Sequence, residues 1–465
     1  MKFTSWGAAR QVTGSMHLLE LAGGYKILID CGLDYELRDR IQNEQFPFLP
    51  SEIDLVIVTH AHVDHSGNLP TLVRCGYEGQ ILCTTATYPL MQLLLADTVN
   101  IFMNDQKTKR RGKKHRHTAR NKTPLYLHKH VMDAMDRVVD IDFHKPFRVN
   151  GQLSIEFIPV GHLLGAAAVV LSVEENGEQK SIAFSGDIGR KGYPVLQDPE
   201  IIPAVDYLVC ESTYGGRFHT KGERIEDVLW QVIMDTCVNS PGRLIIPAFS
   251  IGRTQALIYL LNKLFQENKL PKIHVFVDSP LANAATDVYR RYQHQLNDEA
   301  RAFYEQYGDE FEFDNLTYVQ DAQQSRLISN YYEPCIIISS AGMLEGGRIQ
   351  DHLYHNIQNF YCTIFFVGYC ARGTLGRKLL DGAPLVRIND RELSVYATIR
   401  KTDLLSGHAD HEGLLGMIGH QDPARLKKIF LVHGEPRSME AMAESLAGKG
   451  YASVVMPERG MTYEL

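Results

Sequence analysis

The chain has 465 residues, of which 44% are hydrophobic and 22% are charged, a composition typical of a folded protein with two or three domains. Its formal net charge of −7 argues against a surface that is basic throughout and coats nucleic acid. No apolar run is long enough to cross a bilayer, and the N-terminus lacks the apolar core of a signal peptide, so we expect a cytoplasmic protein without a membrane partner.

Short apolar runs alternate with helical patterns through most of the chain, which predicts an α/β protein. The clearest strands are predicted at residues 25–31, 55–60, 181–187, 207–212, 243–249, 273–279, 335–341, 363–369 and 428–434. Helices are predicted at residues 252–266 and 436–450, and the second of them ends at a glycine-containing stop. The predicted strands are continuously apolar, as expected for strands buried on both faces of a sheet.

Polar residues stand at or just beyond the C-terminal ends of several predicted strands. They are His60, Asp187, Glu211, Ser250, Ser340 and His433. In open α/β sheets this edge is where ligands bind, so the sequence predicts a ligand site there.

The basic segment, residues 107–122, reads KTKRRGKKHRHTARNK and holds nine Lys or Arg residues and no acidic residue. A bare run of charge is more often a solvated loop than a binding site. The alternative is an arm that binds a polyanion. The run by itself is compatible with both interpretations.

The eight cysteines form no C-x-x-C pair, and several lie in apolar runs such as YLVC and EPCIIIS. Small buried thiols in a reducing compartment are the simplest interpretation. We therefore expect neither disulfides nor a zinc site made of cysteines.

The stretch THAHVDHSGNLP, residues 59–70, places His60, His62, Asp64 and His65 within six positions. Imidazole nitrogens and carboxylate oxygens are good ligands for zinc and similar ions. Two histidines spaced by two on an extended segment project to the same side. The Asp–His pair can then face a second ion roughly 3.5–4 Å away, as two-metal sites require. The motif therefore predicts part of a two-metal site.

Further metal ligands are expected elsewhere, because one motif cannot complete two sites. His162 stands in a glycine-flanked turn, VGHLLGA, while Asp187 and His433 end strands in AFSGDIG and LVHGE. Asp30 also ends a strand, in ILIDCG. Its carboxylate could hold the second ring nitrogen of a ligand histidine, or it could cap a turn.

With these residues assembled, the chain resembles the metallo-β-lactamase superfamily, whose successive motifs match Asp30, the H-x-H-x-D-H stretch, His162 and Asp187. Within that superfamily it is similar to the β-CASP nucleases, which include the polyadenylation-factor endonuclease and ribonuclease J. The three motifs that distinguish this group match Glu211 in CESTYGG, His408 in LSGHADH and His433 in LVHGEP. The matching connecting segments are residues 247–255, 277–282, 339–348 and 368–377.

The resemblance implies two Zn²⁺ ions, with Mn²⁺ as the alternative metal. The implied ligands are His60, His62 and His162 for one ion, Asp64, His65 and His433 for the other, and Asp187 for both. It also implies that Glu211 orients His408. In this group a histidine at the third motif accompanies RNA substrates, whereas nucleases that repair DNA carry valine, so His433 favours RNA.

The resemblance further implies the fold and its domains. An αββα sandwich would comprise residues 1–213 and 399–465, with a Rossmann-like β-CASP domain inserted at residues 214–398. The active site is expected in the cleft between them, shaped for single-stranded RNA. The oligomeric state is left open between monomer and homodimer. We expect neither an N-terminal RNA-binding KH module nor the C-terminal domain of ribonuclease J.

Two positions depart from the pattern common in the group. Gly407 stands where alanine is frequent, and Cys370 stands where glutamine is frequent. Both positions concern the detail of the substrate groove.

The ligand set predicts a mechanism. A water between two divalent cations loses a proton near neutral pH, since zinc alone lowers its pKa from about 15.7 to about 7, and the hydroxide attacks phosphorus. The metals, held in part by Asp64, offset charge on the phosphate oxygens. His408, held by Glu211, would protonate the departing 3′-oxygen, and His411 is a rival for that role. We expect endonucleolytic cleavage that leaves 5′-phosphate and 3′-hydroxyl ends, with an exonuclease mode as the alternative.

Two glycine-containing turns, FSIGRTQ and SSAGMLEGGR, predict contacts to the phosphates of the substrate. Such strand-to-helix turns offer backbone N–H groups to an anion, and arginines add paired donors. The residues expected to bind substrate are Ser250, Arg253, Ser339, Ser340 and Arg348.

Other functions fit the sequence less well. A small-molecule hydrolase acting on a thioester or a lactone would not need an inserted domain of about 185 residues (398 − 213). A non-catalytic RNA-binding subunit usually loses metal ligands, and none of the seven is missing here. A flavo-diiron oxidoreductase would carry an acidic ligand where Val63 stands.

Overall fold

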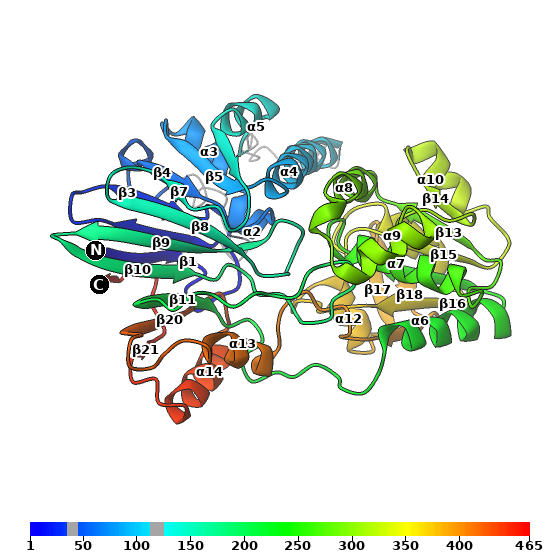
Figure 1. Ribbon diagram of the computed structural model, residues 1–465. Helices are drawn as coiled ribbons and strands as arrows, with labels where there is room; N and C mark the ends of the chain where they lie inside the picture. Colours follow the sequence, from blue (N-terminus) through cyan, green and yellow to red (C-terminus); the bar gives the residue numbers. More distant parts are fainter. Residues whose placement is uncertain (35–44, 112–124) are drawn as a thin grey trace. The chain divides into compact units, whose positions relative to one another are not determined.

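The computed structural model describes the backbone of residues 1–34, 45–111 and 125–465, and the side chains of these residues except 104–111 (Figure 1). The basic segment 107–122 therefore lies outside the residues described in full, and its role stays a prediction. Among the described residues, no helix is both long enough and apolar enough to cross a membrane.

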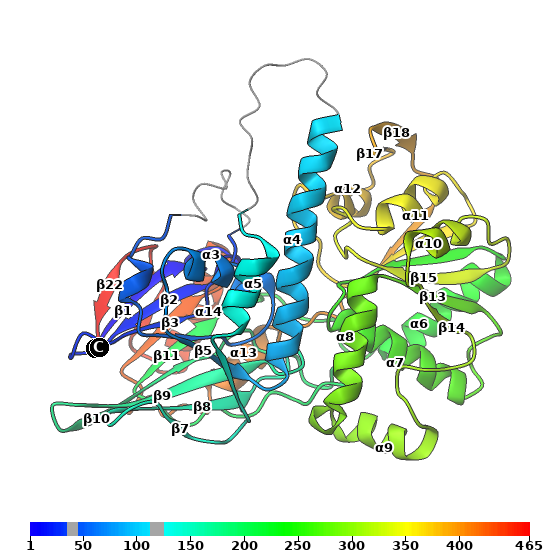
Figure 2. The same ribbon diagram turned by 90° about the horizontal axis from the view of Figure 1, so that it is seen from above.

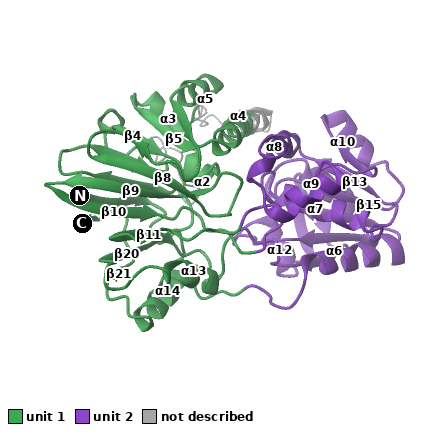
Figure 3. Cartoon of the chain, in the orientation of Figure 1, with its two compact units in different colours: residues 1–191, 198–218, 408–465 green, residues 192–197, 219–407 purple. Residues whose placement is uncertain are grey.

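The described residues form two compact units (Figure 3). The first unit comprises residues 1–191, 198–218 and 408–465, and the second comprises residues 192–197 and 219–407. The predicted domain bounds stay a prediction; they are 1–213, 214–398 and 399–465.

Two seven-stranded sheets make up the centre of the first unit. The first sheet has the order β22 (Thr462–Glu464), β1 (Lys2–Gly7), β2 (Met16–Glu20), β3 (Lys26–Ile29), β4 (Leu55–Ile57), β5 (Gln80–Thr84) and β6 (Val138–Ile141). The second has the order β21 (Val454–Val455), β20 (Lys428–Val432), β11 (Tyr207–Glu211), β10 (Glu178–Phe184), β9 (Ala167–Glu175), β8 (Leu153–Pro159) and β7 (Phe147–Arg148). In the first sheet, neighbouring strands from β3 to β6 are parallel. In the second sheet, the neighbours β10, β11, β20 and β21 are parallel.

The two sheets of the first unit pack face to face. One buried apolar cluster joins Phe3 and Ile29 of the first sheet to Phe157, Val209 and Phe430 of the second. Helices lie beside both sheets in Figure 1, and they are α2 (Val63–Ser66), α3 (Leu69–Arg74), α4 (Thr87–Arg111), α5 (His128–Met135), α13 (His411–Ile418) and α14 (Pro436–Gly448), with a 3₁₀ turn η1 (Pro50–Glu52). The predicted αββα sandwich is confirmed.

A six-stranded, fully parallel sheet makes up the centre of the second unit. Its order is β14 (Leu316–Tyr318), β13 (His274–Asp278), β15 (Cys335–Ser339), β12 (Arg243–Pro247), β16 (Cys362–Phe366) and β19 (Thr398–Lys401). A separate hairpin joins β17 (Leu385–Ile388) to β18 (Arg391–Ser394).

Helices connect the parallel strands of the second unit. They are α6 (Ile225–Ile233), η2 (Met234–Asn239), α7 (Arg253–Gln266), α8 (Pro280–Arg291), η3 (Gln293–Gln295), α9 (Asp298–Tyr307), α10 (Ala322–Ile328), α11 (Ile349–Asn356) and α12 (Leu375–Leu380). Figure 2 shows α11 and α12 on one side of this sheet and α7 on the other. The predicted Rossmann-like architecture is confirmed.

All nine predicted strands are present, and each ends one to three residues before its predicted end. The reason is visible at three of them. Asp30, Gly186 and His433 have φ values of 61°, 56° and 50°, which an extended strand does not allow. The polar residues at the strand ends therefore belong to turns, and these turns direct their side chains.

All eight cysteines are free thiols in this structure, and seven of them are buried. Burial raises the pKa of several of these thiols, for example that of Cys210 to about 12. The buried thiols therefore behave as small apolar side chains.

Candidate metal centre and its surroundings

The H-x-H-x-D-H motif occupies the loop and the short helix that follow strand β4. His60 and His62 belong to the loop, whereas Asp64 and His65 lie in helix α2. Strand β4 ends at Ile57, so the two histidines lie in a turn and not on the extended segment predicted for them. Ser66 holds this turn, because its hydroxyl donates to the carbonyl oxygen of His62 at 3.1 Å.

A close approach between two chain segments requires glycine at position 32. A Cβ atom on Gly32 would lie 1.6 Å from the carbonyl oxygen of Asp64, so any other residue would displace helix α2. The same carbonyl oxygen accepts a hydrogen bond of 2.8 Å from the N–H of Ser15. The loop that follows strand β3 is thereby packed against the motif.

The other three candidate ligands stand in turns at the ends of second-sheet strands. His162 lies between β8 and β9, after Gly161 with a φ of 63°. Asp187 follows β10 and Gly186, and His433 follows β20. Four widely separated segments are thus brought to one edge of the sandwich.

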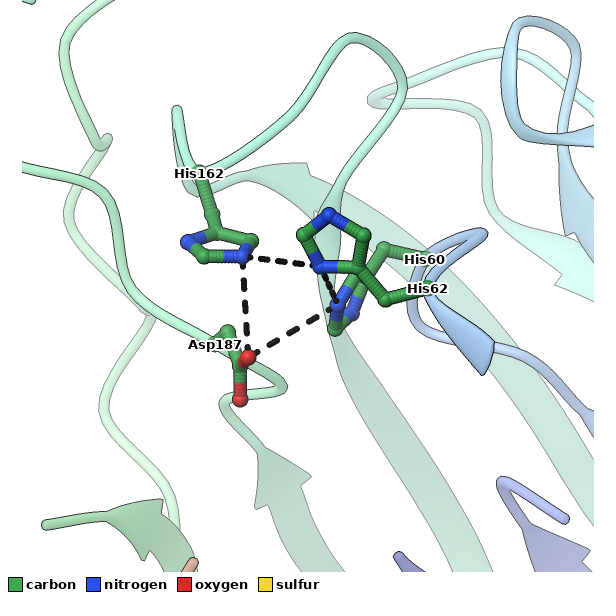
Figure 4. A group of neighbouring side chains, drawn as sticks. All are labelled: His60, His62, His162 and Asp187. Carbon is green, nitrogen blue, oxygen red and sulfur yellow. Dashed lines mark hydrogen bonds and ion pairs between the residues drawn. The ribbon is translucent and has the colours of Figure 1, made fainter. Parts of the chain in front are cut away.

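Three imidazole rings and a carboxylate form the first cluster, which comprises His60, His62, His162 and Asp187 (Figure 4). Nδ1 of His62 lies 3.1 Å from Nε2 of His60 and 3.2 Å from Nε2 of His162. Oδ2 of Asp187 lies 3.7 Å from Nε2 of His60 and 3.6 Å from Nε2 of His162. These ligand atoms, all of types that zinc accepts, lie within 4.8 Å of one another.

The second cluster comprises Asp64, His65 and His433. Nε2 of His433 lies 3.3 Å from Nε2 of His65 and 3.7 Å from Oδ2 of Asp64. Oδ1 of Asp187 lies 3.4 Å from Nε2 of His65. The structure therefore brings all seven predicted ligands together, and their binding of metal stays a prediction residue by residue.

Asp187 belongs to the first cluster and also faces the second, because its Oδ1 lies 3.4 Å from Nε2 of His65. Its Oδ1 is buried and accepts no hydrogen bond. Burial by itself would raise the pKa of Asp187, but the charges of His433 and His65 hold that pKa well below its ordinary value. A buried carboxylate oxygen without a hydrogen-bond donor is costly unless a cation lies beside it. This oxygen and the surrounding donors fit a pair of divalent cations.

Asp30 lies directly behind the second cluster. Its Oδ2 is 2.7 Å from Nδ1 of His65, and its Oδ1 accepts a hydrogen bond of 2.8 Å from the N–H of Thr59. The hydroxyl of Thr59 also donates to Oδ2 at 3.0 Å. With Nδ1 of His65 engaged by a carboxylate, its Nε2 is the nitrogen that faces the cluster. Of the two roles open for Asp30, the geometry favours that of a residue that orients a ligand.

A buried histidine lies one hydrogen bond farther from the second cluster. Nε2 of His17 is 3.2 Å from Oγ of Ser15, and this hydroxyl is 3.4 Å from Oδ2 of Asp30. Burial, together with the charges of His65 and His433, lowers the pKa of His17 to about 3. His17 is therefore neutral in the folded protein at neutral pH.

Acid is expected to destabilise the metal-free protein through His17. The pKa of His17 is about 3 in the folded protein, whereas an unfolded histidine has a value near 6.5. As the pH falls below about 6.5, His17 binds a proton in the unfolded chain but not in the folded chain. This difference should lower the free energy of unfolding by about 2 kcal/mol between pH 7 and pH 5.

Urea unfolding at both pH values measures this effect. In His17→Gln, the loss of unfolding free energy between pH 7 and pH 5 should be smaller than in the wild type by about 2 kcal/mol. An identical pH dependence in the variant would contradict the prediction.

Glu211 and His408 form a pair beside the clusters. Nδ1 of His408 is 3.2 Å from Oε1 of Glu211, whose carboxylate also accepts hydrogen bonds from the N–H groups of Ile188 at 2.6 Å and Thr213 at 3.3 Å. The His408 ring centre lies 4.6 Å from that of His162. Burial lowers the pKa of His408, but Glu211 and the other nearby carboxylates together raise it to about 9. The imidazole therefore keeps a proton at neutral pH.

His411, the rival candidate for the general acid, is held by structural hydrogen bonds instead. It begins helix α13 and is buried, and its Nδ1 accepts a hydrogen bond of 3.0 Å from the N–H of Gly216. Its Nε2 lies 3.1 Å from Oγ of Ser445. The His408 side chain, by contrast, is 22% exposed. The geometry favours His408 over His411.

The predicted phosphate-contacting residues all lie in the second unit. The hydroxyl of Ser340 donates to Oγ of Ser279 at 2.8 Å, and Oγ of Ser250 lies 3.2 Å from the same atom. Ser339 is buried, and its hydroxyl donates to the carbonyl oxygen of Asp278 at 2.9 Å. Two of the three predicted serines therefore share a row of hydroxyls with Ser279, whereas Ser339 is turned toward its neighbouring strand.

The two predicted arginines are held within the second unit. Nη1 of Arg348 donates to Oδ1 of Asp278 at 2.6 Å. Nε of Arg253 donates to the carbonyl oxygen of Leu405 at 3.2 Å, and its guanidinium lies over the ring of Phe249 at 4.9 Å. A guanidinium carries five N–H donors, so both arginines keep donors for an anion. Their contact with phosphate stays a prediction.

Three residues that support these groups are not singled out by the sequence pattern. Thr213 places its hydroxyl 3.0 Å from Nδ1 of His433. Asp278 and Ser279 hold the arginine and the serine row of the second unit. Their only sequence signal is their position inside the segments CESTYGG and VDSPLA.

Three family models match successive parts of the chain. Residues 25–214 match the Beta-lactamase superfamily domain, and residues 254–379 match the Beta-Casp domain. Residues 392–457 match the Zn-dependent metallo-hydrolase RNA specificity domain.

Whole-chain relatives agree with these matches. A ribonuclease from Thermus thermophilus is 32% identical and is covered over 97% of both chains. The transcription termination factor FttA of Methanocaldococcus jannaschii is 31% identical over 92% of this chain, which spans 66% of that factor. An RNase J-like protein of the same organism is 28% identical over 92% of this chain and 91% of its own length.

Proposed function

Because the chain belongs to the β-CASP family of the metallo-β-lactamase superfamily, we propose that it cuts single-stranded RNA internally, with two zinc ions and with His408 as the general acid. The enzyme is a metal-dependent RNA hydrolase. The observation that carries the finer proposal is Asp187, whose two oxygens face separate clusters of ligand side chains.

The metal-holding residues follow from this arrangement. His60, His62 and His162 would hold one ion and Asp64, His65 and His433 the other, with Asp187 shared. When bound, the ions supply an activated water and offset charge on the phosphate. Zn²⁺ is the proposed metal, with Mn²⁺ as the alternative, and Asp30 would keep His65 turned toward its ion.

The proposed role of His408 is to deliver a proton from Nε2 to the departing 3′-oxygen. Its Nδ1 is held by Glu211, so the ring is oriented and the other nitrogen carries the transferable proton. The pKa of His408, raised to about 9, supports this role because the imidazole is protonated at neutral pH. The products would carry 5′-phosphate and 3′-hydroxyl ends.

Contacts to the substrate backbone are proposed for residues of the second unit. Hydroxyl groups and guanidinium groups donate hydrogen bonds to phosphate oxygens without regard to base sequence. The proposed residues are Ser250, Arg253, Ser340 and Arg348; Ser339 is left out because its buried hydroxyl donates to the carbonyl oxygen of Asp278. The row of hydroxyls that joins Ser250 and Ser340 through Ser279 supports this proposal.

Labelled oligonucleotides test the proposed function. Single-stranded RNA and DNA of equal sequence, each labelled at the 5′ or the 3′ end, are incubated with the protein with and without a chelator. We expect internal RNA fragments from both labels, no cleavage of DNA, and no cleavage in chelator. A circular RNA without ends is the control for internal cleavage.

Three outcomes would contradict the proposal. RNA cleavage that persists after complete metal removal would exclude a metal-dependent mechanism. Hydrolysis of a thioester or a lactone by a preparation that leaves RNA intact would favour a small-molecule hydrolase. An intact circle together with single-nucleotide products would replace the endonuclease by an exonuclease.

A further inference from the structure

We propose that Thr213 is a positioning residue that fixes the tautomer of His433 and thereby makes the second cluster able to bind metal. The inference rests on the proposed function, in which the second cluster holds one of the two ions. It assigns a role to a side chain that is neither a candidate ligand nor a candidate acid.

The register of the second sheet brings the two residues together. Strands β11 and β20 are parallel neighbours, with Glu211 opposite Val432, so the turns that follow them run side by side. Oγ1 of Thr213 lies 2.9 Å from the carbonyl oxygen of His433 and 3.0 Å from its Nδ1. One hydroxyl therefore contacts both the backbone and the ring of the same histidine.

The hydrogen count of the hydroxyl selects the tautomer. The Thr213 hydroxyl donates to the carbonyl oxygen of His433 at 2.9 Å, and this contact uses the single hydrogen of Oγ1. The Oγ1 atom can then only accept from the ring, which places a hydrogen on Nδ1. A histidine binds metal in its neutral form, which carries one such hydrogen, so Nε2 of His433 then keeps its lone pair for the ion. Nε2 is the atom that lies 3.3 Å from Nε2 of His65 in the second cluster.

The backbone leaves His433 little freedom to choose another arrangement. Its φ is 50°, and its N–H donates to the carbonyl oxygen of Ala8 at 2.7 Å. The next residue, Gly434, donates its N–H to the carbonyl oxygen of Gln11 at 3.1 Å. Oδ1 of Asp187 lies 3.5 Å from Nδ1 but accepts no hydrogen bond. The Thr213 hydroxyl is thus the group placed to receive the Nδ1 hydrogen.

Thr213 also supports the proposed general acid, through a different atom. Its backbone N–H donates to Oε2 of Glu211 at 3.3 Å, and Oε1 of Glu211 faces Nδ1 of His408. Changing the side chain removes the contact with His433 and leaves the backbone contact with Glu211. The two roles can therefore be separated by mutation.

Three variants test the inference through metal binding. Thr213→Val removes the hydroxyl at nearly constant volume, and Thr213→Ser keeps it. Ser212→Ala is the matched control, because the Ser212 hydroxyl donates at 2.8 Å to the carbonyl oxygen of Val432 and not to a ring. Zinc affinity is measured by competition with a chromophoric chelator, starting from metal-free protein.

We expect Thr213→Val to weaken one of two binding events by about 10–100-fold, which is the usual cost of losing a partner of a ligand histidine. Thr213→Ser and Ser212→Ala should bind both ions as the wild type does. In ¹⁵N spectra of the zinc-loaded wild type, His433 should carry its hydrogen on Nδ1. This signature reports the tautomer and does not depend on cleavage.

Two results would overturn the inference. In one, Thr213→Val binds both ions with wild-type affinity; in the other, the spectra place the hydrogen of His433 on Nε2. A wild-type protein that binds no divalent ion would instead overturn the proposed function, so the two failures can be told apart.

Discussion

Replacing His408 with alanine is expected to slow RNA cleavage by ~10²–10⁴-fold, the usual contribution of a general acid, while both metal ions stay bound. The imidazole lies beside the first cluster, with its ring centre 4.6 Å from that of His162. It is not one of the seven ligand candidates, so its loss should remove the proton donor alone. Single-turnover kinetics and metal analysis of the same preparation measure both quantities.

Two further variants sharpen the test of His408. His411→Ala changes a histidine whose two nitrogens both contact fold residues, so it should lower stability and leave the rate of the chemical step near that of the wild type. Glu211→Gln removes the charge that raises the pKa of His408. The alkaline decline of the cleavage rate should therefore move to lower pH in that variant. A His408→Ala enzyme that cuts RNA at the wild-type rate would disprove the assignment.

Replacing Asp187 with asparagine is expected to weaken the binding of both metal ions and to abolish most RNA cleavage. One oxygen of Asp187 faces each cluster, and Oδ1 accepts no hydrogen bond. Asparagine keeps the size of the side chain but removes its negative charge. Loss of a direct ligand should lower the affinity for each ion by more than the roughly 10–100-fold that is typical of losing a residue that only orients a ligand.

Metal content and single-turnover cleavage of the same preparation measure the effect of Asp187→Asn. Asp206→Asn is the matched control, because Asp206 is a carboxylate of the same unit that accepts hydrogen bonds from the N–H and hydroxyl of Ser181 at 2.8 and 2.9 Å. The control should keep both ions and its cleavage rate. Two ions bound with wild-type affinity in Asp187→Asn would show that the carboxylate is not shared.

Some features of this protein could be predicted from local sequence because few other structures are compatible with the local pattern. Continuous apolar runs predict the buried parallel strands, and all nine runs proved to be strands. Strands β8 and β9 are not predicted, because polar residues such as Glu156 and Ser172 interrupt them on the exposed side. The stretch from His60 to His65 likewise predicts metal binding, because it holds four side chains of metal-ligand type at a spacing that few purely structural roles require.

The sequence by itself determined the α/β class, the H-x-H-x-D-H motif and the identity of the other candidate ligands. Only the tertiary structure decided how they are paired and supported. Asp30 lies 35 residues from His65, and Thr213 lies 220 residues from His433, yet each places an oxygen beside Nδ1 of its histidine. Such pairs depend on which strands are neighbours and on φ values at strand ends, because a hydrogen bond acts over about 3 Å and carries no trace in local composition. The ligand types are local chemistry, whereas the oxygen partners of the histidine Nδ1 atoms and the contacts of the two Asp187 oxygens are properties of the folded sandwich.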